Sequence, residues 1–152
     1  MRKLFNASIM YVVLGLLAGL YYRELTKARD FPSGEYTQLA VAHTHLLALG
    51  FIVVAVVLAL EAVLHLSRSK AFNWFFWLYN IGVLATTAIM IWRGTLTVIG
   101  SELSKGLDSA ISGVAGLGHI FITVAFVFFF VATGKALART GWKTQPEVAA
   151  AA

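Results

Sequence analysis

Four long apolar runs dominate the sequence, and short polar segments separate them. The runs are roughly Leu4–Tyr22, Tyr36–Leu66, Ala71–Ile99 and Ala110–Ala138. Each has about 20 residues or more, which is the length that an α-helix needs to cross a bilayer. Lipid offers no hydrogen-bond partner to an exposed backbone, so runs of this length must be helical. The pattern therefore predicts an all-α membrane protein with four transmembrane helices.

The polar segments predict the connections between these helices. "RELTKARDFPSGE" contains Pro32 and Gly34, which favour a loop. "SRSK" is a short basic turn, and "GSELSKGLDS" leads to the fourth run. We expect one four-helix transmembrane domain over residues 1–138. The polar segment 139–152, "RTGWKTQPEVAAAA", is expected to be a disordered C-terminal tail.

The composition agrees with this class and excludes others. The chain has 152 residues, of which 59% are hydrophobic and only 12% charged, whereas a soluble domain has about 25% charged residues. It has no cysteine, which excludes disulfides, iron–sulfur clusters and thiolate metal sites. The net charge of +5 does not indicate nucleic-acid binding, because the basic residues flank apolar runs. The predicted partner is the lipid bilayer.

The basic residues also predict an orientation. One side of the membrane would carry most of them: Arg2, Lys3, Arg68, Lys70, Lys135, Arg139 and Lys143. On the other side, basic residues are offset by acidic ones. Because cytoplasmic segments carry an excess of lysine and arginine, both termini are predicted to be cytoplasmic.

Ionisable side chains inside the apolar runs are the candidate functional residues. "VAHTHLLALG" carries His43 and His45, and the fourth run carries His119. At about 1.5 Å per residue, these histidines and Arg93 fall in one layer of the outer leaflet. Ionisable groups in a membrane are costly and usually face a bundle interior or a site. The layer is therefore a candidate site, although hydrogen bonds between helices remain an alternative for each histidine.

The spacing of the histidine pair restricts the chemistry. Residues two apart on a helix point about 200° apart, so His43 and His45 cannot easily bind one ion. Copper or zinc is thus less favoured than haem b, whose iron needs only one axial imidazole from each face. Gly50 and Gly116 would let a flat macrocycle approach the backbone, or would serve helix packing. Arg93 suits haem propionates, with ordinary snorkelling as its alternative.

Two resemblances bear on these residues. "VAHTHLLALG" resembles the His-x-His segment of subunit I of the haem–copper oxidases, in which successive histidines ligate two different haems. The whole chain resembles a family of small four-helix bacterial membrane proteins of unassigned function, through "LFNASIMYVVLGLLAGLYYRE" and "SGVAGLGHI". That likeness implies a multi-pass protein of the bacterial inner (plasma) membrane. It implies no activity.

The oxidase resemblance implies an architecture. Subunit I contains three similar arcs of four helices, so this chain would resemble one four-helix arc, and three copies would form a homotrimer. A haem would then lie between neighbours, with His43 from one subunit and His45 from the next. The rival arrangement places His119 opposite His43 or His45 within one chain. The extra histidines of the oxidase copper site are absent, so coupled oxygen reduction is not expected.

The sequence thus predicts an integral membrane haem-binding protein, similar to a b-type cytochrome. Its expected function is electron transfer, or redox or gas chemistry. It would then be an oxidoreductase-like electron carrier, whose redox partner the sequence does not identify. A metal-ion or proton transporter or channel that uses the buried histidines is the alternative. A structural protein with hydrogen-bonded histidines is a third reading.

Overall fold

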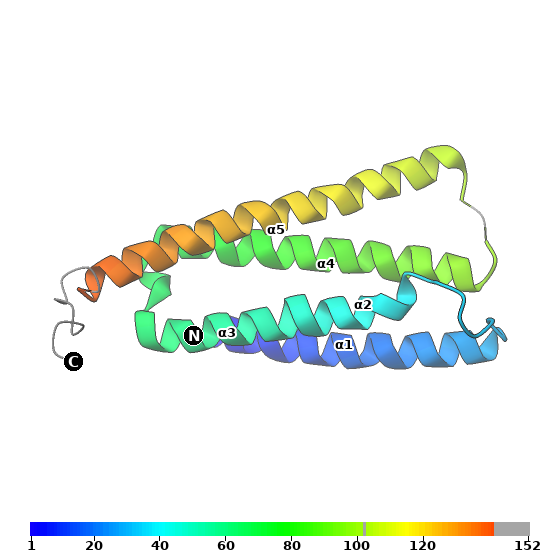
Figure 1. Ribbon diagram of the computed structural model, residues 1–152, viewed down its shortest axis with the longest axis horizontal. Coiled ribbons are helices and arrows are strands. Elements are labelled where there is room, and N and C mark those ends of the chain that lie inside the picture. The colour runs from blue at the N-terminus through cyan, green and yellow to red at the C-terminus, as the bar shows by residue number, and fades with distance from the viewer. Residues whose placement is uncertain (102, 142–152) are drawn as a thin grey trace, which may run out of the picture.

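The computed structural model describes residues 1–101 and 103–141, which form helices joined by short connections (Figure 1). Helix α1 covers Arg2–Ala28. The second span consists of α2 (Leu39–His45), the π-helix η1 (Leu46–Ile52) and α3 (Val53–Leu64). A short 3₁₀ turn, η2 (Leu66–Arg68), leads to α4 (Lys70–Val98), and α5 covers Lys105–Arg139. The four predicted spans are confirmed as four helical spans that are long and apolar enough to cross a membrane.

Two helices extend beyond the predicted apolar runs. Helix α1 continues past Tyr22 to Ala28 because "RELTKA" consists mostly of strong helix formers. Helix α5 begins at Lys105, five residues before the apolar run, because the Ser104 hydroxyl accepts a hydrogen bond from the Leu107 N–H at its start. Such capping satisfies a backbone donor that the helix itself leaves unpaired. Hydropathy alone therefore underestimates both helices.

The spans pack in chain order. Helix α1 mainly contacts α2, η1 and α3, and it also contacts α4. The second span contacts α4 through α2 and η1, α4 contacts α5 along its length, and α3 also contacts α5. Within the described residues α1 makes no contact with α5. Figure 1 shows α5 at one edge of the array and α1 at the other. The four spans thus form an open array rather than a closed bundle.

Close contacts between spans occur where a side chain is missing. A Cβ atom added to Gly94 of α4 would lie 2.1 Å from the Leu39 backbone nitrogen. A Cβ at Gly82 of α4 would lie 2.7 Å from the Gly118 carbonyl oxygen of α5. Small residues allow membrane helices to approach this closely. The glycines therefore set the crossing points of α4 with both of its neighbours.

Helix α1 begins and α5 ends at the same end of the array, which we call the terminal end (Figure 1). The opposite end, with the connections between α1 and α2 and between α4 and α5, is the distal end. This arrangement agrees with termini on one side of the membrane, and the assignment of that side to the cytoplasm stays a prediction. The predicted tail falls largely on residues 142–152, which lie outside the described residues, as does Lys143.

Candidate functional site

His45 and His119 have the same local geometry. The Nδ1 atom of His45 lies 3.2 Å from the Val41 carbonyl oxygen, and that of His119 lies 2.9 Å from the Ala115 carbonyl oxygen. A carbonyl oxygen only accepts hydrogen bonds, so Nδ1 must carry the proton in each neutral ring. Each Nε2 then keeps its lone pair, and neither Nε2 has a hydrogen-bond partner among residues 1–101 and 103–141.

His43 has a different environment. Its Cβ and Cγ atoms pack against Gly19 of α1, at 3.7 Å from where a Cβ of that glycine would lie. Its Nε2 lies 3.4 Å from the Thr44 hydroxyl oxygen, whereas its Nδ1 is buried without a partner in the described chain. The side chains of His43 and His45 therefore point in different directions, as predicted: His43 packs against α1, and His45 does not.

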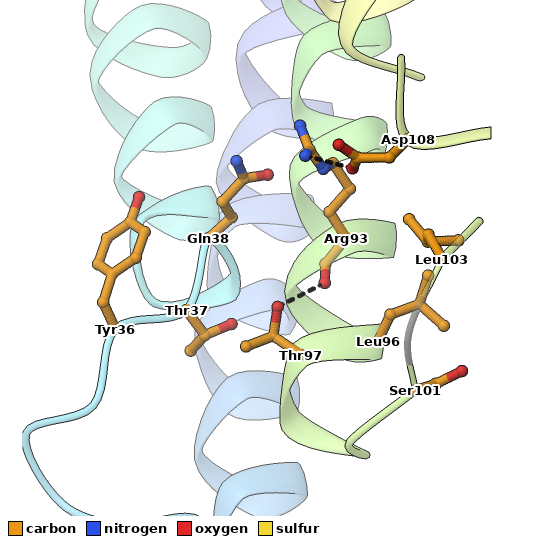
Figure 2. A pocket seen from close by; sticks show the side chains of 9 residues that line it. All are labelled: Tyr36, Thr37, Gln38, Arg93, Leu96, Thr97, Ser101, Leu103 and Asp108. Carbon is orange, nitrogen blue, oxygen red and sulfur yellow. Dashed lines mark hydrogen bonds and ion pairs between the residues drawn. The ribbon is translucent and has the colours of Figure 1, made fainter. Parts of the chain in front are cut away.

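A polar pocket lies at the distal end between α2, α4 and α5 (Figure 2). Its volume is about 430 Å³. Arg93 of α4 is at its centre: Nη2 donates to the Asp108 carboxylate of α5, and Nη1 donates to the Ser112 hydroxyl at 3.2 Å. The Arg93 side chain is 26% exposed. Figure 2 shows the Gln38 amide on the side of α2 that faces this guanidinium. The lining residues are Tyr36, Thr37, Gln38, Arg93, Leu96, Thr97, Ser101, Leu103 and Asp108.

The helical repeat relates this pocket to two of the histidines. His45 follows Gln38 by seven residues, and Gln38 has helical backbone angles. His119 follows Ser112 by seven residues and Asp108 by eleven. These separations return to within about 20° of the same direction on a helix. His45 and His119 therefore lie on the helix stripes that border the pocket, two to three turns further from the distal end.

Aromatic contacts define the direction of the α5 stripe independently. Phe126 follows His119 by seven residues, and its ring centroid lies 5.4 Å from that of Tyr79 on α4. The Tyr79 hydroxyl in turn donates to the Leu49 carbonyl of η1 at 2.8 Å. The face of α5 that carries His119 and Phe126 is therefore directed toward the same side of α4 as the second span. His119 itself is exposed, and His45 is half-buried.

The two predicted glycines occupy contrasting positions. A Cβ at Gly50 would lie 2.3 Å from the Tyr11 ring of α1, so the ring fills the space beside this glycine. Gly116 on α5 has no atom within 4 Å of its would-be Cβ. Within one chain, Gly50 therefore serves the packing of α1 on η1, whereas the surface at Gly116 is open.

The structure does not gather the three histidines into one cluster. In the described part of the chain, no group of three or more His, Cys, Asp or Glu side chains is arranged to hold a metal ion. Sequence reasoning named Arg93 but did not assign Asp108 or Gln38 to the site. The signal was available for α5, because Asp108, Ser112 and His119 recur at helical spacing on one face.

A family model described as "Protein of unknown function (DUF2871)" matches residues 1–136, and the chain belongs to that family. No curated protein and no solved structure matches the chain.

Proposed function

We propose that this member of the DUF2871 family is an integral membrane haem-binding protein, similar to a b-type cytochrome, of the bacterial inner membrane. His45 and His119 would be the axial ligands of haem b. The observation that carries this proposal is the free Nε2 on each of the two imidazoles, fixed by an Nδ1–H bond to a carbonyl oxygen. Histidines that bind metal ions usually donate their other ring N–H in this way.

The polar pocket supports the same assignment. Haem carries propionate groups that need cationic or polar partners near the membrane surface. The Arg93 guanidinium has five N–H groups, and its hydrogen bonds to Asp108 and Ser112 use two of them. The remaining N–H groups are available to a carboxylate. The Asp108 carboxylate would compete with the propionate for this guanidinium, so Arg93 would have to contact both carboxylates.

The cost of burying polar groups in lipid also favours a bound group. His119 is exposed on a helix that is apolar enough to span the membrane, and an imidazole facing hydrocarbon is unfavourable. Ligation of iron would remove this cost. Helices α2 and α5 do not contact each other in the described residues, so a haem held by both would bridge them.

The arrangement of subunits follows from the choice of ligands. With His45 and His119 of one chain as ligands, the site would lie within that chain. The oxidase-like arrangement, a homotrimer with His43 of one subunit and His45 of the next, is the second possibility. The open array of four spans favours an arc that associates with further copies. In that arrangement His119 would line the same haem pocket.

The ligation predicts the chemistry. Bound haem would supply reversible one-electron transfer. A haem held by both imidazoles would favour electron transfer over binding of a gas. Loss of one ligand would open a position for oxygen or nitric oxide.

The proposal is tested by adding haem to the purified protein and recording oxidised and dithionite-reduced visible spectra. The wild type should give a Soret band and sharp bands after reduction. His45→Ala and His119→Ala should lose the sharp reduced bands, whereas His43→Ala is the matched control and should keep them. A wild type that remains colourless would contradict the proposal and leave metal-ion or proton transport as the better alternative. Loss in His43→Ala and His45→Ala alone would favour the trimer.

A further inference from the structure

Two adjoining cavities lie between α1 and α4 at the terminal end, away from His43, His45 and His119. One, of about 310 Å³, is lined by residues of the first turn of α1, by Ser67 and by the first turns of α4. The other, of about 360 Å³, continues along the two helices to Met10 and Leu84. Lys3 and Phe76 line both cavities. They therefore form one continuous groove, which we call the α1–α4 groove.

The two parts of this groove differ in chemistry. The part toward the middle of the membrane has apolar walls, apart from Asn6 and Asn80. Asn80 donates its amide N–H to the Phe76 carbonyl of its own helix at 2.6 Å. The part at the terminal end is also largely apolar, but Arg2, Lys3, Ser67 and Asn73 add basic and polar groups to its wall. An occupant would thus need an apolar chain and an anionic head.

The basic charges of the groove are available to a ligand. Within residues 1–101 and 103–141, neither Arg2 nor Lys3 forms an ion pair with an acidic side chain. The Lys3 ammonium lies 5.9 Å from the centroid of the Trp77 ring, which holds it at the junction of the two cavities. Glu61 contacts this wall through Ser67, whose N–H and hydroxyl both donate to its carboxylate. A phosphate could bind Arg2 and Lys3 without disturbing the hydrogen bonds between Ser67 and Glu61.

We propose that the α1–α4 groove binds one anionic phospholipid. Its phosphate contacts Arg2 and Lys3, and one acyl chain follows the apolar walls toward Leu84. One leaflet of hydrocarbon is about 15 Å thick, half of the roughly 30 Å core. On α4 the lining residues run from Phe72 to Leu84, and these twelve rises of about 1.5 Å cover that depth. Basic pockets between membrane helices are known to select anionic head groups.

The test compares lipids by native mass spectrometry of the detergent-purified protein. Phosphatidylglycerol and phosphatidylcholine with identical acyl chains are the probes, and glycerol 3-phosphate is the head-group control. Phosphatidylglycerol should bind about tenfold more tightly than phosphatidylcholine, and glycerol 3-phosphate should not bind at the same concentrations. Equal binding of the two lipids would overturn the proposal, as would a dimer whose formation excludes the lipid.

Two double variants separate a built site from diffuse charge attraction. Arg2→Gln with Lys3→Gln should weaken phosphatidylglycerol binding about tenfold and phosphatidylcholine binding much less, because choline offsets the phosphate charge of the second lipid. Arg68→Gln with Lys70→Gln removes the same charge at the same end but lies outside the groove. This matched control should change binding less than twofold. Equal losses in the two double variants would overturn the site. Because neither pair lies near His43, His45 or His119, the haem spectrum should be unchanged in both.

Discussion

At the scale of single residues, His43 and His45 show what a short motif can and cannot predict. Their angular separation follows from the helical repeat alone, and it is present in the fold. Their surroundings do not follow from it: His43 packs on Gly19 of α1, whereas His45 donates Nδ1–H to its own helix and keeps Nε2 free. A histidine that is bonded to its own helix and one that packs on a neighbour look the same in sequence.

Gly50 and Gly116 make the same point, because both were predicted as places where a macrocycle approaches the backbone. We expect Gly50→Ala to destabilise the protein by about 1–3 kcal/mol, since the new Cβ would overlap the Tyr11 ring. Gly116→Ala, whose position is open, is the matched control and should be neutral or slightly stabilising. Thermal unfolding in detergent measures both. Equal stability of the two variants would contradict the described packing of α1 on η1.

At the scale of elements, hydropathy predicts the spans because lipid leaves the backbone no alternative to helices. It does not predict that the second span changes to a π-helix directly after His45. Two contacts between spans lie at this segment, namely the Tyr11 ring against Gly50 and the Tyr79 hydroxyl on the Leu49 carbonyl. π-Helical segments are rare and are frequent at functional sites. The position of η1 directly after His45 therefore agrees with a functional site at the depth of His45.

Tyr79→Phe tests the support of this π-helix. The variant keeps the ring but removes the buried donor to the Leu49 carbonyl, which should cost about 1–2 kcal/mol of unfolding free energy. Tyr21→Phe is the control, because the Tyr21 hydroxyl bonds to Thr95 at an exposed position. Hydrogen exchange should also become faster in η1 for Tyr79→Phe alone. Unchanged exchange in η1 would show that the segment does not depend on Tyr79.

At the scale of the whole molecule, the number of spans and their approximate limits could be predicted, but their packing order could not. The open array arises from glycines at particular crossings and from the aromatic side chains between α4 and α5. Neither set differs in hydropathy from residues that face lipid. The polar pocket could not be predicted for a different reason: Gln38, Arg93 and Asp108 lie on three different elements, and only the fold brings them to one pocket.

Mixed expression of two variants distinguishes a site within one chain from a site between chains. His45→Ala and His119→Ala chains with different tags would be produced together and purified through both tags. If one chain supplies both ligands, the mixed sample should contain no six-coordinate haem, since every chain lacks one imidazole. Recovery of the wild-type spectrum would instead assign the haem to an interface between copies.

Resonance Raman spectroscopy of the ferric protein with added haem tests the central claim most directly, because its marker bands report the spin and coordination state of the iron. The account predicts six-coordinate, low-spin haem in the wild type and in His43→Ala. It predicts conversion to a five-coordinate, high-spin state, or loss of haem, in both His45→Ala and His119→Ala. A wild type without bound haem, or a coordination state that neither of these two variants changes, would contradict it.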